Sequence, residues 1–268
     1  MISLSLKAET NQRSSGIHPL IPKTDLVSAS IDDPLFGSAF GLEGIPRLDR
    51  PAGDKKQEVS IFESDPYGVA AEQFRLMQRR LCNLRPNGGA VLMTSPGAGD
   101  GKSLNAHNLA WALAEAGNST LLLELDMRRP SQSRYIPSRP PSSLVDVLTG
   151  EATAFSAVRR LGDVPMFYLG LDKPAPRPVK LLRSQALLDL MCWARQTFSW
   201  VVIDGPPVLA VSDVEELVPQ VDLVLMVVRE RGTPRAMLER AVDHLGERLN
   251  FLIYNDVSIS SEYGYGYR

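Results

Sequence analysis

Residues 94–103 read TSPGAGDGKS; they follow an apolar run, AVLM, and lead into the helical pattern NAHNLAWALAEAG at 105–117. A strand, a glycine-rich turn, Lys-Ser and a helix together place backbone N–H groups and a helix N-terminus around a phosphate group. The segment is therefore interpreted as a phosphate-binding P-loop, although the usual pattern has glycine where this chain has Pro96. Lys102 is expected to reach the β- and γ-phosphates of a nucleotide, and the Ser103 hydroxyl to bind Mg²⁺.

The glycines of this loop supply the backbone freedom that a tight phosphate-binding turn needs. A dinucleotide-binding fingerprint is excluded, because it would require glycine where Lys102 stands. A plain glycine-rich turn between a strand and a helix is the remaining alternative. The nucleotide-binding residues expected from this segment are Gly97, Gly99, Asp100, Gly101, Lys102, Ser103 and Leu104.

Two more apolar segments end in acidic residues. Residues 120–125 run into Glu124 and Asp126, and residues 200–203 run into Asp204. A hydrophobic run that ends in one Asp is typical of the Walker B motif, whose carboxylate holds Mg²⁺ directly or through water. Acidic residues at the carboxyl ends of neighbouring parallel strands lie where ligands bind in open α/β sheets. The alternative interpretation of Glu124 and Asp126 is a polar strand end without function.

Strand and helix patterns alternate along most of the chain, which predicts parallel β-α-β units with right-handed crossovers. The continuous apolar run at 223–228 indicates a strand that helices cover on both faces. The expected fold is therefore α/β, a three-layer parallel sheet flanked by helices. Expected strands lie at 90–93, 120–125, 165–169, 200–204, 223–228 and 251–254, and expected helices run from about Tyr67 to before Pro86, through the segment after the P-loop, over 142–148, and around 187–194 and 238–245.

The first of these helices has an apolar stripe and a charged face. The stripe is predicted to contain Phe74, Met77, Leu81 and Leu84, and the opposite face carries Glu72, Arg75 and Arg79. Glu72 and Arg75 can pair along the helix or with a neighbouring subunit. A solvated face is the favoured interpretation, because surface ion pairs contribute little free energy.

Composition limits the remaining possibilities. The chain has 268 residues, is 44% hydrophobic and has a formal net charge of −2, which gives no reason to expect a nucleic-acid partner. No apolar run approaches the 18 or so residues of a membrane span, and no signal peptide is visible, so a cytoplasmic protein is expected. Residues 1–60 are expected to form a weakly ordered leader, 61–256 the nucleotide-binding domain and 257–268 a flexible tail.

The tail reads SEYGYGYR and contains three tyrosines, Tyr263, Tyr265 and Tyr267. A glycine-rich tail cannot pack these rings into a core, although tyrosine favours contact with other groups. One interpretation is a tail of no consequence. The other is that the three hydroxyls are substrates.

Taken together, residues 67–268 resemble the cytoplasmic bacterial tyrosine kinases (BY-kinases) of capsule and exopolysaccharide synthesis. The matching segments, in order, are EQFRLMQRRL at 72–81, TSPGAGDGKSLNAHNLA at 94–110, LLLELDMRRP at 121–130, SSLVDVLTG at 142–150, WVVIDGPPVLAVSDV at 200–214 and the tyrosine-rich end. The resemblance implies a P-loop NTPase fold of the MinD/ParA type. It also implies an ATP- and Mg²⁺-dependent kinase that phosphorylates its own C-terminal tyrosines in trans.

The resemblance also assigns roles to individual residues. It implies that Lys102 and Ser103 bind the ATP phosphates and Mg²⁺, that Asp126 and Asp204 complete the metal site, and that Asn255 contacts adenine. Tyr263, Tyr265 and Tyr267 would be the autophosphorylated residues. Glu124 stands where the family has Asp, so it or a nearby carboxylate would accept the tyrosine proton, with one extra methylene, about 1.5 Å, of reach.

The implied partners are a separately encoded membrane-spanning polysaccharide copolymerase that acts as activator, further copies of the chain in a homo-oligomer, and a phosphotyrosine phosphatase. The activator would recruit the chain to the inner face of the membrane. The oligomerisation motif E-x-x-R-x-x-R of the family is incomplete here, because Gln78 takes the place of its last arginine and Arg79 comes one residue late, about 100° round the helix.

Two alternatives to a kinase remain open. A partitioning-type switch ATPase would hydrolyse ATP and dimerise, but such proteins have a lysine where this chain has Gly97, and they have no reason for a tyrosine tail. A catalytically weak nucleotide-binding scaffold of a polysaccharide export complex would be consistent with Glu124 in place of Asp.

Overall fold

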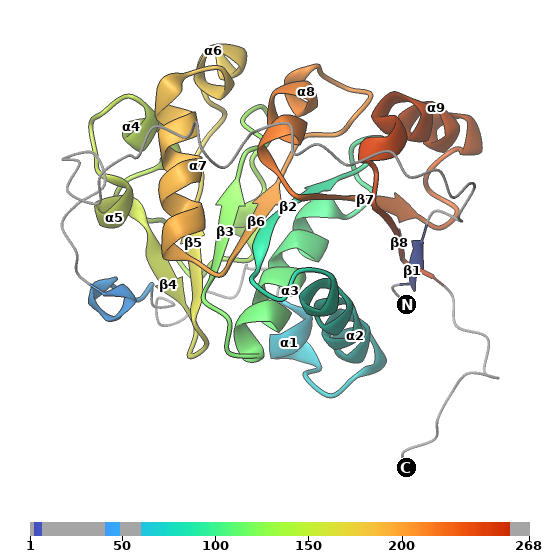
Figure 1. Ribbon diagram of the computed structural model, residues 1–268, viewed down its shortest axis with the longest axis horizontal. Coiled ribbons are helices and arrows are strands. Elements are labelled where there is room, and N and C mark those ends of the chain that lie inside the picture. Colours follow the sequence, from blue (N-terminus) through green and yellow to red (C-terminus); the bar gives the residue numbers. More distant parts are fainter. Residues whose placement is uncertain (1–2, 7–40, 49–59, 258–268) are drawn as a thin grey trace.

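The computed structural model describes residues 3–6, 41–48 and 60–257, and in them an eight-stranded sheet lies between two layers of helices (Figure 1). The strand order is β1-β8-β7-β2-β6-β3-β5-β4, and neighbouring strands are parallel except at the two edges, where β1 and β4 are antiparallel. The strands are β1 (Ser3–Leu6), β2 (Gly89–Thr94), β3 (Thr120–Glu124), β4 (Arg159–Leu161), β5 (Met166–Leu169), β6 (Trp200–Asp204), β7 (Leu223–Arg229) and β8 (Phe251–Asn255).

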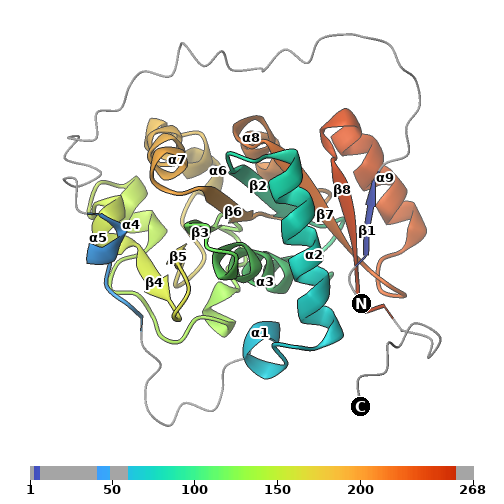
Figure 2. The ribbon, with the colours of Figure 1, turned by 60° about the horizontal axis from the view of Figure 1, so that its bottom comes forward.

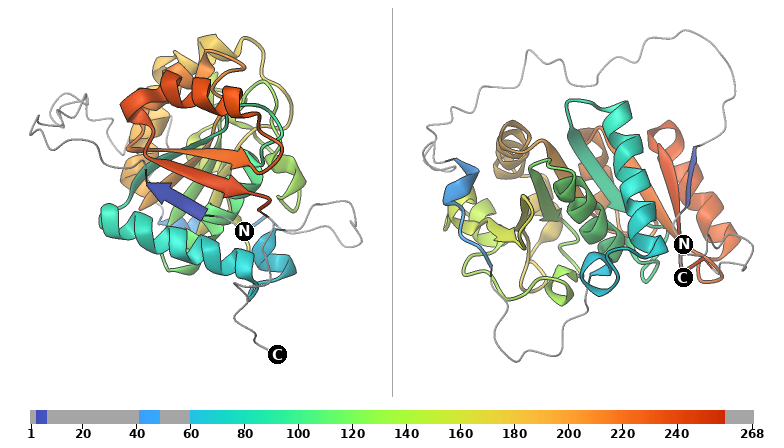
Figure 3. Two further views of the ribbon diagram at one scale, coloured as in Figure 1. Left: turned by 90° about the vertical axis from the view of Figure 1, so that its right-hand side faces the viewer. Right: turned by 90° about the horizontal axis from the view of Figure 1, so that it is seen from below.

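The helices divide between the two faces of the sheet, as Figures 2 and 3 show. On one face lie α1 (Ile61–Ser64), α2 (Val69–Leu84) and α3 (Lys102–Glu115), packed on one apolar cluster. The other face is covered by α4 (Leu144–Leu148), α5 (Ala154–Ala157), α6 (Pro178–Leu182), α7 (Gln185–Thr197), α8 (Asp213–Leu217) and α9 (Arg235–Leu245). The predicted three-layer α/β fold with a mostly parallel sheet is therefore confirmed.

The edges of the sheet differ from the prediction. The antiparallel strands β1 and β4 were not expected, and neither were the short helices α1, α5, α6 and α8. Each of these elements has at most five residues, too few for a period in the sequence to become visible. Short antiparallel edge strands also expose little unpaired backbone at the ends of the sheet.

Parts of the predicted leader belong to the fold. β1 pairs with β8, and the segment 41–48 lies against β4 with Ile45 and Leu48 buried. The backbone N–H of Leu48 donates to the carbonyl of Arg160 (2.9 Å), which fixes this segment. The rest of the leader and the tyrosine tail from residue 258 onward lie outside the described residues. In the described part of the chain, no helix is long and apolar enough to cross a membrane.

The apolar stripe of α2 is shorter than predicted. Phe74, Met77 and Leu81 are fully buried, but Leu84 is 53% exposed. Leu84 is the last residue of the helix, and at 100° per residue it lies at the margin of the stripe. It therefore does not join the buried part of the stripe.

Candidate nucleotide-binding site

Three adjacent strands bring the sequence motifs to one edge of the sheet. β2 leads into the P-loop, and it neighbours β6, which in turn neighbours β3. The register pairs Glu124 directly with Asp204, and the backbone N–H of Asp126 donates to the carbonyl of Asp204 (3.0 Å). The loop and both acidic strand ends therefore meet at the carboxyl edge of the parallel strands, where α/β sheets bind ligands.

The P-loop needs its glycines. Gly99 and Gly101 have φ angles of 92° and 96°, a region that side chains disfavour. A Cβ atom on Gly101 would also stand 2.2 Å from Nδ2 of Asn255. That amide donates to the carbonyl of Asp100 (3.0 Å), so the end of β8 contacts the loop closely. The expected contact of Asn255 with adenine stays a prediction.

Asp100 has a structural position within the loop. Its carboxylate accepts hydrogen bonds from the backbone N–H of Gly97 (3.2 Å) and from the hydroxyl of Thr233 (2.7 Å). These bonds use both oxygens of a buried side chain. The contacts of Asp100 with Gly97 and Thr233 thus fix the shape of the loop, and neither Asp100 nor Gly97 lines the cleft.

A cleft of about 660 Å³ opens over the P-loop. Among the predicted residues, Gly97, Asp100, Glu124 and Asp204 are not part of its lining. The cleft is lined by the predicted residues Gly99, Gly101, Lys102, Ser103, Leu104, Asp126 and Asn255. It is also lined by Arg129 and Arg134, which were weighed as phosphate contacts against a solvated face, and by Ser131, Tyr135, Arg229 and Asp256.

The ammonium group of Lys102 lies at the centre of the predicted metal-binding residues. Its Nζ is 2.8 Å from Oδ2 of Asp126, 3.4 Å from Oδ1 of Asp204 and 3.2 Å from Oγ of Ser103. Burial by itself would lower the pKa of Lys102, but the charges of Asp204 and Asp126 outweigh that effect and raise this pKa above its ordinary value. Lys102 is therefore a firmly protonated cation.

These residues have the chemistry of a Mg²⁺ site. A hydroxyl and two carboxylates offer the hard oxygen ligands that Mg²⁺ prefers. In the structure the three side chains of Ser103, Asp126 and Asp204 already converge on one positive charge, the ammonium of Lys102. The donor set predicted from the sequence therefore fits a small cation.

Glu124 occupies a different environment from the one expected of a base that faces a substrate. Its carboxylate is fully buried and is absent from the cleft lining. One oxygen accepts the backbone N–H groups of Ser131 (2.6 Å) and Gln132 (2.8 Å). The other accepts the hydroxyl of Tyr168 (2.9 Å) and the N–H of Leu171 (3.0 Å).

Burial, followed by the charge of Asp204, raises the pKa of Glu124 to about 7, although the backbone donors oppose the shift. Burial, followed by the charge of Glu124 and the hydrogen bond to it, raises the pKa of Tyr168 well above its ordinary value. All four hydrogen bonds of Glu124 join it to groups of the protein itself. Its role as the base that accepts the tyrosine proton stays a prediction.

Two residues outside the sequence prediction contact the predicted Mg²⁺ ligands directly. Ser131 donates its hydroxyl to Oγ of Ser103 (2.7 Å), and the buried amide of Gln132 donates to Oδ2 of Asp204 (2.9 Å). Both follow Pro130 at the start of a 3₁₀ turn, Gln132–Arg134. In the sequence, only their position directly after the second acidic motif could have drawn attention to them. No spacing rule connects them to residues 103 and 204.

The charged face of α2 is paired within the subunit. The guanidinium of Arg75 donates to Glu72 (2.6 Å) on the same helix and to both oxygens of Glu115 (2.7 and 2.8 Å) at the end of α3. It also lies 5.2 Å above the ring of Phe62. Pairing along the helix, one of the two interpretations of this face, is therefore observed, together with a tie between α2 and α3.

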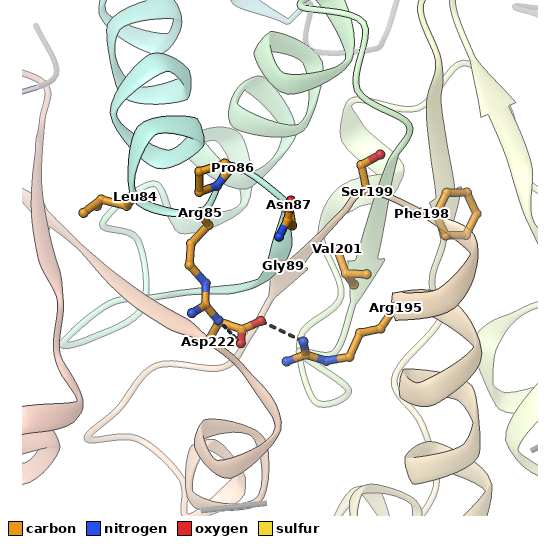
Figure 4. Close-up of a pocket in the computed structure, with 11 residues that line it drawn as sticks. Leu84, Arg85, Pro86, Asn87, Gly89, Arg195, Phe198, Ser199, Val201 and Asp222 are labelled. Carbon is orange, nitrogen blue, oxygen red and sulfur yellow. Dashed lines mark hydrogen bonds and ion pairs between the residues drawn. The ribbon is translucent and has the colours of Figure 1, made fainter. Parts of the chain in front are cut away.

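A second cavity, of about 400 Å³, lies at the opposite edge of the sheet, where the parallel strands begin (Figure 4). Its central carboxylate, Asp222, pairs with Arg85 and with Arg195 (2.7 Å), and it also accepts the N–H of Ala90 (2.8 Å). Because Asp222 already pairs with both arginines, we interpret the lining of this cavity as a structural ion-pair network.

Comparison with known proteins adds independent information. No protein-family model matches the chain. The tyrosine-protein kinase YwqD of Bacillus subtilis (strain 168) is 28% identical over 225 residues, which are 81% of this chain and 95% of the relative. The putative tyrosine-protein kinase EpsB of Ralstonia nicotianae is 31% identical over 220 residues, 80% of this chain and 29% of the relative.

The succinoglycan biosynthesis transport protein ExoP of Rhizobium meliloti is 28% identical over 245 residues, 87% of this chain and 30% of the relative. The chain therefore spans less than a third of ExoP and of EpsB, but nearly all of YwqD.

Solved structures with the same fold agree with these relatives. The chimerical protein CapA2B2 aligns with a TM-score of 0.70 and 24% identity, over 81% of this chain and 96% of the other. The kinase domain of VpsO aligns with a TM-score of 0.62 and 27% identity, over 71% of this chain and all of the other. Sequence relatives and structural neighbours point to one family, and the chain belongs to it: the bacterial tyrosine kinases, or BY-kinases.

Proposed function

We propose that this chain is an ATP-dependent protein-tyrosine autokinase that acts in exopolysaccharide or capsule synthesis. The observation that supports this most directly is the position of Lys102, which lies within 3.4 Å of Ser103, Asp126 and Asp204 at the floor of a cleft of about 660 Å³. A cleft of that size accommodates a nucleotide. The kinase names of the relatives supply the reaction type.

In the proposed reaction, a tyrosine oxygen forms a bond to the γ-phosphorus of ATP while the bond from that phosphorus to the β–γ bridging oxygen breaks, and ADP leaves. Mg²⁺, when bound by Ser103, Asp126 and Asp204, neutralises charge on the phosphate oxygens. Lys102 leaves its two carboxylates and binds the β- and γ-phosphates. The loop N–H groups and the start of α3 hold the phosphate chain in line with the attacking oxygen.

The phenol proton requires a carboxylate that the substrate can reach. Asp126 lines the cleft, whereas Glu124 is fully buried and accepts four hydrogen bonds from the protein. Oδ2 of Asp126 is bound to Lys102 and would hold Mg²⁺ once Lys102 moves to the phosphates. Oδ1 accepts the backbone N–H of Arg129 (3.1 Å) and keeps a further lone pair for the phenol proton. We therefore assign proton acceptance to Asp126, the nearby carboxylate, and a bracing role to Glu124.

The substrates proposed for this site are Tyr263, Tyr265 and Tyr267 of another copy of the chain. A homo-oligomer, a phosphotyrosine phosphatase that reverses the reaction, and a membrane-spanning copolymerase that recruits the chain to the inner face of the membrane complete the proposal. Arg75 is already bound to Glu72 and Glu115, so an assembly that used Arg75 would first have to break those pairs.

The test is to incubate the purified full chain with Mg²⁺ and ATP and to map phosphotyrosine by mass spectrometry. We expect phosphate on the three tail tyrosines, its loss in Lys102→Met, and no loss in the exposed-lysine control Lys180→Met. Mixing Lys102→Met with a chain whose tail tyrosines are Phe tests the trans reaction, because only transfer between copies can label the Lys102→Met tail.

The alternatives give different results in the same experiment. Release of phosphate without phosphotyrosine would identify a switch ATPase and would contradict the kinase proposal. Nucleotide binding without any turnover would identify a scaffold. Asp126→Asn should abolish transfer, while a variant at Glu124 that folds and still transfers phosphate would support the bracing role.

A further inference from the structure

The side chain of Gln132 has an unusual position for a residue outside any known motif. It is completely buried, and its amide nitrogen donates both to Oδ2 of Asp204 (2.9 Å) and to the backbone carbonyl of Ser103 (2.9 Å). Both neighbours of this atom are acceptors, so it must be the amide nitrogen, and the amide oxygen must lie on the other side. One side chain thus connects the Walker B carboxylate to the first turn of the P-loop helix.

The adjacent residue strengthens this connection. Ser131 donates its hydroxyl to Oγ of Ser103 (2.7 Å), so two consecutive residues contact two of the three expected Mg²⁺ ligands. Glu124 holds the backbone of both, through hydrogen bonds of 2.6 and 2.8 Å to their N–H groups. The buried carboxylate of Glu124 therefore fixes the backbone of Ser131 and Gln132, and the side chains of these two residues contact the expected metal ligands.

The contact with Gln132 determines which oxygen of Asp204 remains available. Asp204 is fully buried, with Oδ2 bound to Gln132 and Oδ1 facing Lys102. When Lys102 moves to the phosphates, the amide of Gln132 remains as a side-chain donor to this desolvated carboxylate. A buried anion is costly without such a donor, and a fixed rotamer presents Oδ1 to the cation without reorganisation.

We propose that Gln132 is a positioning residue of the Mg²⁺-nucleotide site, which orients Asp204 and thereby sets the affinity for Mg²⁺. This inference rests on the proposed function, because it requires that Asp204 take part in binding Mg²⁺ with a nucleotide. Partners of metal ligands typically change metal affinity by about 10- to 100-fold when they are removed. Removal of the Gln132 amide is expected to fall at the lower end, about tenfold, because Asp204 itself is retained.

The test measures ADP binding by calorimetry, first in EDTA and then at fixed ADP with increasing Mg²⁺. Gln132→Met keeps the size of the side chain and removes the donor, and Gln132→Asn keeps the amide on a shorter stem. We expect both to raise the Mg²⁺ midpoint about tenfold while the ADP affinity in EDTA changes less than about twofold.

Gln220→Met is a matched control. Gln220 also donates its amide to a backbone carbonyl, that of Glu216 (2.7 Å), and like Gln132 it has a buried Oε1 without a partner among the described residues, but it lies outside the cleft lining. This control should leave both ADP affinities and the Mg²⁺ midpoint unchanged.

The possible results separate the inference from the proposal beneath it. If the wild-type chain binds ADP without any effect of Mg²⁺, the proposed site itself fails. If Mg²⁺ strengthens ADP binding equally in the wild type and in the folded Gln132 variants, only the role of Gln132 fails. Equal weakening with and without Mg²⁺ would also overturn it, because a loop that merely supports the fold would act on both. Should Gln132→Met not fold, Gln132→Asn decides.

Discussion

The buried histidine of the P-loop helix should make the folded state sensitive to acid. His107 lies on α3, is only 3% exposed, and has Nδ1 without a hydrogen-bond partner among the described residues. Burial lowers its pKa from 6.5 to about 4, although the nearby Gln132 side chain opposes the shift. His107 therefore stays neutral in the folded protein at a pH where it is protonated in the unfolded chain.

The sign and size of the effect follow from proton linkage. Between pH 6.5 and about 4 the unfolded state binds more protons than the folded state, so the free energy of unfolding falls as the pH falls. The full difference of about 2.5 pKa units corresponds to roughly 3 kcal/mol, of which about 2 kcal/mol is lost between pH 7.5 and pH 5. Above about pH 7.5 the contribution is nearly constant.

The total stability curve would hide this effect, because Glu124 acts in the opposite direction. Its pKa, raised to about 7, makes the folded state bind the additional proton between about pH 4.5 and pH 7, which favours folding as the pH falls. A difference between the wild type and a variant without His107 removes the contribution of Glu124 and every other common group. The measurement must therefore be a difference.

The assay is urea unfolding of the wild type, His107→Gln and His107→Leu at pH 5, 6 and 7.5 and constant ionic strength. The stability of the wild type relative to either variant should fall by about 2 kcal/mol between pH 7.5 and pH 5. Gln and Leu differ in polarity, so their offsets will differ, but the pH dependence must be the same because both remove the titration. A difference that stays constant within about 0.5 kcal/mol, or that grows at low pH, would refute the reasoning.

Three further predictions concern single side chains. Tyr168→Phe removes one of the four donors to a buried carboxylate and should lower the free energy of unfolding by about 1–3 kcal/mol in urea titrations; an unchanged midpoint would contradict the hydrogen bond. Gly101→Ala should weaken ADP binding at least about tenfold, because its Cβ meets an amide at 2.2 Å, whereas Gly117→Ala, with φ of 88° and nothing within 4 Å, should cost stability without changing ADP affinity. Arg75→Ala should destabilise by about 1 kcal/mol through the loss of the α2–α3 tie, and Arg235→Ala, which removes a side chain that is 91% exposed, should have a smaller effect; equal effects of the two would show that the tie contributes nothing.

Local pattern was enough to locate most of the elements that build the cleft. The apolar runs before Thr94, Glu124 and Asp204 were each read as strands, and all three are strands of the central sheet. The strand-helix alternation predicted their parallel arrangement, because a crossover helix returns the chain to the same edge. From that arrangement together with the family resemblance, Lys102, Asp126 and Asp204 were expected to meet, and they do.

The partners of the buried polar groups could not be obtained in the same way. Glu124 and Tyr168 are 44 residues apart, and Gln132 and Asp204 are 72 apart. Whether a carboxylate at a strand end faces a cleft or a neighbouring loop depends on side-chain reach and on which donors the fold places within about 3 Å. The buried environment of Glu124 was not foreseen for this reason, since its donors come from β5 and from two loops that no local period describes.

The sequence by itself determined the class of fold, the position of the phosphate-binding loop and the set of acidic groups that gather beside it, because glycine content, hydrophobic period and strand-end charge are local properties of the chain. Only the tertiary structure decided the position and the contacts of each group. It placed Lys102 among the metal ligands, enclosed Glu124 among four donors and set Gln132 against Asp204. These outcomes depend on packing between segments that are distant in the sequence. There, a buried charge without a partner raises the free energy of the folded state.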